Sequence, residues 1–378
     1  MKMPFTGRRR AGPPSPLAQD PAEETKSATP LVAVELSRRA CFTAGDLGSL
    51  CREGYARNPV VYRCVRLIAE SAASVPLRGD ALPGGTPEAL ERFYGYLQVA
   101  GEAYLHAARI GEDVIGVSAL RPDAVEVLTD RAGRPAGYAV TTPVGRTAHR
   151  RDALTGTCDV MRLALFNPLS DTAAQSPLRA ASTSVDLHNQ GTRWAKALLD
   201  NSARPSGALV CKGGSSGLSA SQVSSLKAEL ESHFSGPVNA GRPMVLEGGL
   251  DWTSMGLSPS DMDFAQGRRE AARDIALAFG VPPILLGIPG DNTYANYAEA
   301  NRAFWRQTVM PLVARTAAAL SDWLGAFGPD VAVLPDFDAV PALAPERAAL
   351  WAKLEAASFL DEDEKRALAG LPMRGTLQ

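Results

Sequence analysis

The sequence predicts a mixed α+β fold in which long helices bracket small sheet-containing regions. Apolar residues recur at helical spacing most clearly at 58–76, 176–201 and 258–280. Short apolar or alternating runs between residues 114 and 166 predict paired strands, and a second group is predicted between 207 and 255. Because 45% of the 378 residues are hydrophobic, the chain can bury a substantial core, which excludes disorder of the whole chain.

Residues 1–30 have the composition of a flexible arm, with six prolines, five basic and three acidic residues. The triple arginine Arg8–Arg10 could touch nucleic acid or a neighbouring subunit, and a solvated tail is the competing interpretation. No apolar stretch follows these arginines, so we expect neither a secretion signal nor a twin-arginine signal. No run of about 18 apolar residues occurs, so we expect no membrane contact.

The first predicted helix opens at Asn58-Pro59, an N-cap followed by proline in the first turn, and runs to Pro76. Its apolar face consists of Val61, Cys64, Val65, Ile68, Ala72 and Val75. Residues 77–90 are predicted to be a Gly/Pro loop, and residues 93–108 a second amphipathic helix. The strands that follow are predicted at 114–120, 124–128, 136–142 and 159–166, with a turn at Asp130–Gly133.

The middle of the chain predicts two long helices around a small α/β insert. The first helix runs from Ser176-Pro177 to Asn201, and its thin apolar stripe among small residues favours side-by-side packing. The second begins at Ser258-Pro259 and ends at Gly280, before two prolines. One face of it is marked by Phe264, Arg268, Ala271, Ile275 and Ala278. The insert is predicted to contain strand 207–211, loop 213–217, helix 219–234 and strands near 244–246 and 251–255.

The C-terminal third is predicted to be mainly helical. A Gly- and Pro-rich loop at 281–292 leads to a long helix at 293–323, in which Pro311 should cause a kink. Two shorter helices are predicted at 345–358 and from Asp361, where Asp361 and Glu364 have the spacing of a capping box.

Composition excludes several classes of function. Lys and Arg number 39 against 41 Asp and Glu, and the net charge of −2 argues against a globally basic surface that grips nucleic acid. The five cysteines form no C-x-x-C pair, which indicates neither a disulfide framework nor a zinc site and favours synthesis in a reducing compartment. The four histidines lack metal-ligand spacing, and no phosphate-binding loop is present. We therefore expect no metal and no cofactor.

One motif suggests an enzyme. Residues 213–217, Gly-Gly-Ser-Ser-Gly, match the G-x-S-x-G nucleophile elbow, with Ser215 as nucleophile between a predicted strand and a predicted helix. Only His233 follows Ser215, and the intervening acids Glu229 and Glu231 lie on the same short helix, which does not provide a separated triad. A serine hydrolase using Ser215 is therefore the weaker alternative to a Gly/Ser loop tip.

Several segments together resemble the phage portal proteins of the HK97 family, in the right order over about residues 45–378. The resemblance lies in Asn58-Pro59-Val60-Val61-Tyr62, Gly101-Glu102-Ala103-Tyr104-Leu105, Leu257-Ser258-Pro259-Ser260-Asp261-Met262-Asp263-Phe264, Phe279-Gly280-Val281-Pro282-Pro283 and Thr293-Tyr294-Ala295-Asn296-Tyr297. The chain is shorter than is usual in the family at 76–93 and after Asp336. In this shortening it resembles the portals of alphaproteobacterial gene transfer agents.

The resemblance implies a ring of about twelve subunits at one capsid vertex, the channel for double-stranded DNA packaging and ejection. Its partners would be the major capsid protein, the terminase large subunit and then the head–tail adaptor, with non-specific DNA passage. The protein would be made in the bacterial cytoplasm and lie at the portal vertex of the released particle. The implied parts are an arm at 1–30, a wing at 31–175, stem helix 1 at 176–202, a clip at 203–257, stem helix 2 at 258–280, a tunnel loop and wing helix at 281–339, and a reduced crown at 340–378. A head–tail adaptor or a monomeric binding module is the further alternative, and it would sediment as a single subunit or a small oligomer.

Candidate functional residues follow from this assignment. A channel with many Lys and Arg side chains would hold DNA phosphates and stall the duplex, so the mixed charges of the second stem helix suit sliding. We expect the charged residues of this helix, which include Asp261 and Asp263, to be divided between the channel wall and ion pairs between subunits. The competing interpretation is that all these charges lie between subunits or in solvent. For the predicted tunnel loop, the competing interpretation is an ordinary connection between two helices. The channel-facing candidates are Arg268, Arg269, Glu270, Arg273, Asp274, Asn292 and Tyr294, and the partner-binding candidates of the clip are Gly213, Ser215, Ser216 and Gly217.

Overall fold

The computed structural model places most of the chain after residue 45. It describes residues 46–79, 86–111, 113–152, 154–170, 172–200, 207–211, 221, 224–225, 228, 250–254, 264–289, 294–328 and 332–370. Several sequence predictions lie outside these residues: the arm at 1–30, the loop at 213–217, the strand at 244–246, the start of the second long helix at 258–263, and Asn292.

The first predicted helix is confirmed as α2 (Pro59–Ala73). The Asn58 side chain caps it by accepting hydrogen bonds from the backbone N–H groups of Val60 and Val61. All six residues of its predicted apolar face are buried. Before it lie α1 (Leu47–Ser49) and the π-helix η1 (Leu50–Tyr55).

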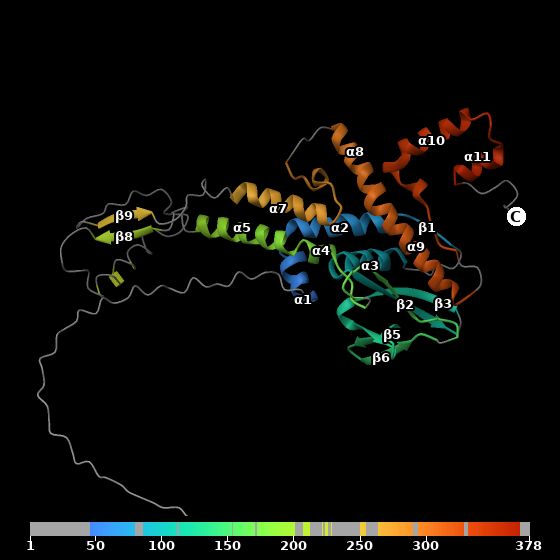
Figure 1. The fold of residues 1–378 in the computed structure, drawn as a ribbon, viewed down its shortest axis with the longest axis horizontal. Coiled ribbons are helices and arrows are strands. Elements are labelled where there is room, and N and C mark those ends of the chain that lie inside the picture. The colour runs from blue at the N-terminus through green and yellow to red at the C-terminus, as the bar shows by residue number, and fades with distance from the viewer. Residues whose placement is uncertain are drawn as a thin grey trace, which may run out of the picture. The chain divides into compact units, whose positions relative to one another are not determined.

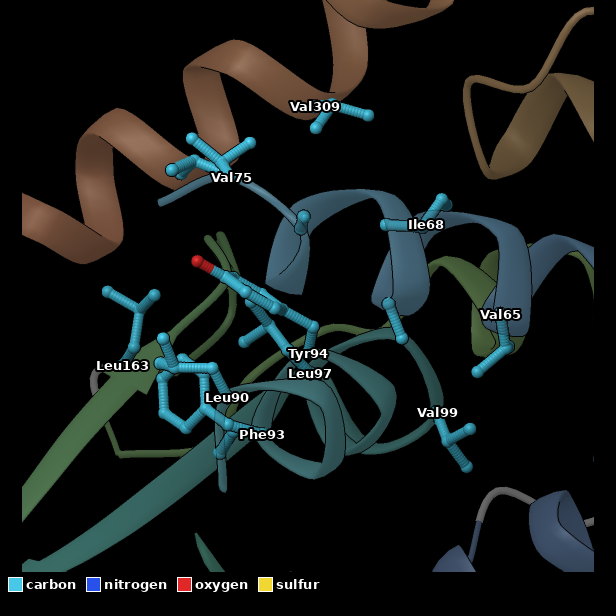
Figure 2. Close-up of a cluster of buried hydrophobic side chains, with 14 of the residues drawn as sticks. Val65, Ile68, Val75, Leu90, Phe93, Tyr94, Leu97, Val99, Leu163 and Val309 are labelled. Carbon is cyan, nitrogen blue, oxygen red and sulfur yellow. The ribbon is translucent and has the colours of Figure 1, made fainter. Parts of the chain in front are cut away.

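Helix α2 packs against α3 (Thr86–Ala100), and their contact forms the centre of the hydrophobic core. Figure 2 shows Phe93, Tyr94 and Leu97 of α3 below Ile68 of α2, with Leu163 from a strand on one side and Val309 from a later helix above. Full burial of such side chains contributes about 1.5–3 kcal/mol each. The two helices therefore hold the later helices and the strand of Leu163 on one core. A second, smaller cluster consists of Tyr104, Tyr138, Val140, Cys158 and Val160.

The predicted second helix was wrong at both ends. It begins at Thr86 and not at 93, and it ends at Ala100, where Gly101 adopts a φ of +83°. Residues 102–110, predicted in part as helix, form strand β2 instead. A Cβ at Gly101 would lie 2.7 Å from backbone atoms of Gln175 and Ser176, so the chain turns where only glycine fits.

Two three-stranded antiparallel sheets follow, with the orders β3-β2-β7 and β4-β5-β6. The predicted strands at 114–120, 124–128, 136–142 and 159–166 are confirmed, and β2 and β6 were missed. Asp130 forms the predicted turn, since its side chain accepts hydrogen bonds from the N–H groups of Ala132 and Arg134. The strands are β2 (Glu102–Ile110), β3 (Asp113–Leu120), β4 (Val125–Thr129), β5 (Pro135–Thr142), β6 (Gly145–Arg150) and β7 (Val160–Ala164).

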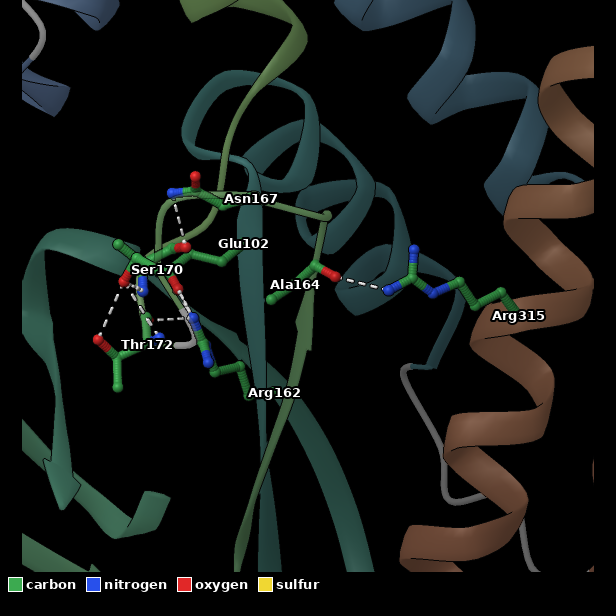
Figure 3. A network of polar contacts seen from close by, with 8 residues as sticks. Glu102, Arg162, Ala164, Asn167, Ser170, Thr172 and Arg315 are labelled. Atoms are coloured by element: carbon green, nitrogen blue, oxygen red, sulfur yellow. Dashed lines mark hydrogen bonds and ion pairs between the residues drawn. The ribbon is translucent and has the colours of Figure 1, made fainter. Parts of the chain in front are cut away.

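A buried ion pair joins the first sheet to the segment that follows it (Figure 3). Arg162 of β7 donates to Glu102 of β2 from Nε at 2.9 Å and from Nη2 at 2.6 Å, and to the carbonyl oxygen of Thr172 at 2.5 Å. The Arg162 side chain is only 8% exposed, so these three bonds satisfy a cation taken out of water. Arg315 donates to the carbonyl oxygen of Ala164 and so ties α9 (Met310–Gly325) to the end of β7.

The first long helix of the middle region is confirmed, with a break at Ala181 that divides it into α4 (Pro177–Ala180) and α5 (Ser182–Asp200). Ser176 is the N-cap, and Leu178 and Val185 are buried as the thin stripe predicts. The second long helix is α7 (Phe264–Ala278). Between them lie two of the predicted strands, β8 (Gly207–Cys211) and β9 (Leu250–Ser254), and the structure pairs them in antiparallel fashion. Residues 221, 224–225 and 228 are helical.

The helix predicted over 293–323 is one run of α8 (Tyr294–Phe304), the π-helix η5 (Trp305–Val309) and α9. The irregularity precedes Pro311, which lacks an N–H and crowds the carbonyl group four residues before it. The Met310 N–H bonds to the carbonyl oxygen of Trp305, five residues back. The irregularity predicted at Pro311 is thus the π-helix η5.

Short elements follow α9. Strand β10 (Leu334–Pro335) pairs with β1 (Leu77–Arg78), and Asp336 forms an ion pair with Arg78. Helices α10 (Ala344–Ala356) and α11 (Glu362–Leu368) follow, and the capping box of Asp361 and Glu364 is present. Among the described residues, no helix combines the length and the apolar character needed to span a bilayer.

Candidate functional site on the paired helices α5 and α7

Helices α5 and α7 lie side by side and antiparallel (Figure 1). Ser184 of α5 meets Asp274 of α7, and Gly191, farther along α5, lies next to Arg268. The buried face of α7 consists of Ala271, Ala272, Ile275 and Ala276, and Phe279 is buried directly after its end. Because most of these residues are small, a neighbouring helix can approach closely.

The predicted face of α7 needs one correction. Ala271 and Ile275 are buried as expected, but Arg268 is exposed, and Ala272 and Ala276 occupy the buried face instead. Arg268 lies one turn before the buried stretch, beside Gly191 of α5, and is exposed.

The five candidate charges of α7 are all exposed, but the structure separates them into two groups. Asp274 accepts a hydrogen bond from the Ser184 hydroxyl at 3.3 Å, and Arg273 donates to the carbonyl oxygen of Pro289 at 2.8 Å. Two of the five therefore bond to neighbouring parts of the same chain, and Arg268 lies beside Gly191 of α5.

Arg269 and Glu270 form the second group. Neither makes an ion pair or a hydrogen bond with any residue that the structure describes. Glu270 projects from α7 on the side opposite the buried residues, whereas Arg269 lies one turn before Ala272, at the edge of the buried face. They are the charges of this helix that remain available for contacts with DNA or with another subunit.

The end of α7 is fixed by Gly280, which adopts a φ of +66°. The Val281 N–H returns to the carbonyl oxygen of Ala276 at 2.9 Å, and the Thr308 hydroxyl donates to the carbonyl oxygen of Gly280 at 2.6 Å. A Cβ at Gly280 would lie 2.9 Å from the Thr308 hydroxyl oxygen, so the turn requires glycine. The end of α7 is thereby joined to η5, between α8 and α9.

The candidate tunnel loop begins at this helix end. Pro283–Leu286 form a 3-10 turn, η4, and the Arg273 guanidinium holds the chain at Pro289. Asn292 lies outside the described residues, as do Gly213, Ser215, Ser216 and Gly217 of the clip. Tyr294 is the first residue of α8.

A buried polar cluster, which sequence reasoning missed, fixes the start of α5 to the first helices. The Asn58 amide donates to Asn189 Oδ1 at 3.0 Å and lies 3.2 Å from His188 Nδ1. The Asn189 amide donates in turn to the carbonyl oxygen of Glu53 at 2.8 Å. Burial, and secondarily the charge of Arg268, lower the pKa of His188, so this histidine has a structural role.

A sequence signal existed for only one member of this cluster. Asn58 before a proline is recognisable as an N-cap, but its partners lie about 130 residues farther along the chain and only folding brings them together. Among the described residues, no group of three or more His, Cys, Asp or Glu side chains could hold a metal ion.

The comparison with known proteins begins with a family. The sequence pattern of the phage portal protein family matches residues 85–370, so the chain belongs to that family. Portal proteins are structural components of particles and not enzymes, and this membership rules out the serine hydrolase that Ser215 suggested.

Similar proteins narrow the assignment. A chain from the virion of a native gene transfer agent particle is 45% identical, with a TM-score of 0.67, and the match covers 88% of this chain and 95% of that one. The same values, with a TM-score of 0.66, describe a chain in the neck of the native particle computed with C12 symmetry. These matches confirm the sequence-based resemblance to gene transfer agent portals.

Two further relatives agree with this result. An uncharacterized protein of Rickettsia bellii (strain RML369-C) is 37% identical over 348 residues, 85% of this chain and 88% of that protein. The crystal structure of an HK97 family phage portal protein from Corynebacterium diphtheriae has a TM-score of 0.55 and covers 77% of this chain and 98% of that one. At 17% identity it shows the shared fold, which is the portal fold.

Proposed function

We propose that the chain assembles into a ring of about twelve copies whose axial channel passes double-stranded DNA at one vertex of a phage-like particle. The support is its membership of the portal family together with 45% identity to a chain in a particle neck computed with C12 symmetry. A ring closes only if each copy offers two different complementary surfaces. The exposed side of the α5/α7 pair provides a candidate for one of them.

The observation that carries the channel assignment is the pair of unpartnered charges on α7. Arg269 and Glu270 have opposite sign and adjacent positions, and neither is neutralised within the described chain. Repeated around a ring, such pairs would give a band of alternating charge with little net attraction for phosphate. A duplex could then slide past without the strong, salt-dependent binding that many lysines or arginines would cause.

The remaining parts follow the same proposal. Residues 281–294 would form the tunnel loop, with Arg273 as its anchor on α7 through the carbonyl oxygen of Pro289. The clip at 203–257 would bind the terminase large subunit during filling and the head–tail adaptor afterwards. The wing would meet the major capsid protein. The protein would be made in the cytoplasm of the bacterium that assembles the particles.

The experiment compares Arg269→Glu with a matched control, Arg131→Glu, which reverses an exposed arginine on the turn between β4 and β5. If Arg269 faces the channel, the variant should form rings by native mass spectrometry and change the yield of DNA-filled particles. If Arg269 lies between subunits, rings should be lost. The control should do neither.

Two results would contradict the proposal. If Arg269→Glu leaves both the rings and the yield of filled particles unchanged, this face of α7 takes part neither in DNA passage nor in contact between subunits. DNA-filled particles made by cells that lack the chain would remove the portal function itself.

A further inference from the structure

An aromatic groove lies between η1, α2 and α3, away from the paired helices α5 and α7. It has a volume of about 370 Å³. Three tyrosines from three different elements form its walls: Tyr55 of η1, Tyr62 of α2 and Tyr96 of α3. Its floor is apolar and buried and consists of Val65, Ala69 and Val99.

The tyrosines are held in place but remain accessible. The rings of Tyr55 and Tyr62 lie 5.2 Å apart at an angle of 44°, and Arg66 donates to the Tyr62 hydroxyl at 3.2 Å while its guanidinium lies over the same ring. Tyr62 is 42% exposed. Gly95 contributes no side chain to the groove and so leaves it open. Grooves lined by fixed aromatic rings bind polyproline II segments, whose stiff backbone loses little entropy on binding.

The charged residues at the rim of the groove restrict the chemistry of the ligand further. Arg66 forms an ion pair with Glu70, and Arg92 forms one with Glu88 at 2.7 Å, so both arginines are neutralised. Glu91 is exposed and makes no ion pair with any residue that the structure describes. The groove therefore offers one uncompensated negative charge beside its apolar floor, which suits a ligand with proline and a cation.

The sequence of this chain contains such a segment. Arg10-Ala11-Gly12-Pro13-Pro14-Ser15-Pro16 has the spacing R-x-x-P-x-x-P, and it is preceded by two more arginines. No other pair of prolines in the sequence has the P-x-x-P spacing. Polyproline II has three residues per turn, so Pro13 and Pro16 would face the same side of the segment.

The length of the chain allows the contact. The first described residue, Asp46, leads into η1, which forms one wall of the groove. Thirty residues separate Pro16 from Asp46, which is about 100 Å fully extended and about 30 Å for a random chain. A tether of this length can reach a groove on another copy that lies within that distance.

We propose that the groove of one copy binds the Arg10–Pro16 segment of a neighbouring copy. The prolines would pack against Tyr55, Tyr62 and Tyr96, and an arginine would lie near Glu91. Segment and groove are two different surfaces of one chain, which is the requirement for a head-to-tail contact around a ring. The proposal rests on the ring assembly proposed above, and it gives the arginine-rich N-terminal sequence a partner other than nucleic acid.

A crosslink tests the contact in the full-length protein. Cys51 is exposed and lines the groove, whereas Cys64 and Cys158 are buried. With Cys41→Ser and Cys211→Ser as background, Ser15→Cys places a second thiol within the segment. A short bismaleimide should then join position 15 to Cys51 of the next copy and give a ladder of subunit multiples on a denaturing gel. The same protein with Cys51→Ser should give none.

Three variants make the test specific. Pro13→Ala with Pro16→Ala, and separately Tyr62→Ala, should lower the rate of crosslinking about tenfold, which corresponds to about 1.4 kcal/mol of lost binding. Tyr297→Ala replaces a tyrosine that is 50% exposed on α8, outside the groove, and should leave the rate unchanged.

Native mass spectrometry of the uncrosslinked samples separates the two proposals. Intact rings that give no ladder, or a ladder that the proline and tyrosine substitutions do not reduce, would overturn the contact and leave the portal ring standing. A crosslink confined to single chains would overturn the contact between neighbours. Absence of rings in the unsubstituted protein, also when the capsid proteins of its own particle are supplied, would overturn both proposals.

Discussion

The buried contact of Asn58 gives a stability prediction whose size follows from the structure. Asn58 is 1% exposed, accepts from two backbone N–H groups at 3.0 and 3.2 Å, and donates to Asn189 Oδ1 at 3.0 Å. Replacing it with alanine removes an N-cap, which costs about 1 kcal/mol. It also leaves a buried amide oxygen without its donor, which costs about 1–3 kcal/mol. Asn58→Ala should therefore lower the free energy of unfolding by about 2–4 kcal/mol.

Asn58→Ser separates the two contributions, because the serine hydroxyl can cap α2 but cannot reach Asn189 as an amide does. It should lose about 1–3 kcal/mol, less than alanine by the value of the cap. Urea unfolding at a fixed protein concentration measures both variants. Losses below about 0.5 kcal/mol for alanine would refute the role of the buried contact, and equal losses for serine and alanine would refute the role of the cap.

Three further predictions concern single sites. Gly101→Ala should destabilise the protein by about 3 kcal/mol or more, because φ is +83° and the new Cβ would lie 2.7 Å from backbone atoms of residues 175 and 176. The control Gly95→Ala, whose Cβ would have no atom within 4 Å, should be neutral or stabilising by up to about 1 kcal/mol. Thermal unfolding measures both glycine variants. Arg162→Lys should cost about 2–3 kcal/mol in urea unfolding, because an ammonium cannot reproduce the forked bonds to Glu102 and the carbonyl oxygen of Thr172; a loss within about 0.5 kcal/mol would contradict this. Burial lowers the pKa of His188 and of His106 below the ordinary value of 6.5, so the unfolded chain binds more protons than the folded one in this range. The free energy of unfolding should therefore be level above about pH 7 and fall as the pH drops through and below 6.5. His188→Gln should flatten the fall, whereas stability that rises on acidification would contradict the assignment.

Elements that depend on neighbouring residues could be predicted from the sequence. The Asn58-Pro59 start of α2 and the capping box of α11 each need only residues within one helical turn. The irregularity before Pro311 follows from the geometry of proline itself. In these places the local chemistry permits one conformation, and packing agrees with it.

Strand β2 shows why other elements could not be predicted. Residues 103–105 are all buried, because β2 lies in the middle of its sheet and both of its faces are covered. Neither the two-residue nor the helical period is then visible in the sequence. Strand β6 was missed for the opposite reason, since five of its six residues are exposed and it is held by the hydrogen bonds to β5.

The candidate site divides in the same way. The sequence located the charges of α7 and the glycine that ends it, because both are properties of one helix. It could not show that Arg273 would bind the carbonyl oxygen of Pro289, or that Asp274 would accept from Ser184, since these contacts join segments 16 and 90 residues apart. Only the folded chain separates Arg269 and Glu270 from the charges that serve the chain itself.

The most direct test of the central claim is the mass and symmetry of the purified full-length protein. Native mass spectrometry should find an assembly of about 480 kDa, twelve times the subunit mass of 39.9 kDa, and negative-stain images should show rings with a central hole. A protein that remains a monomer when supplied with the capsid proteins of its own particle would contradict the account.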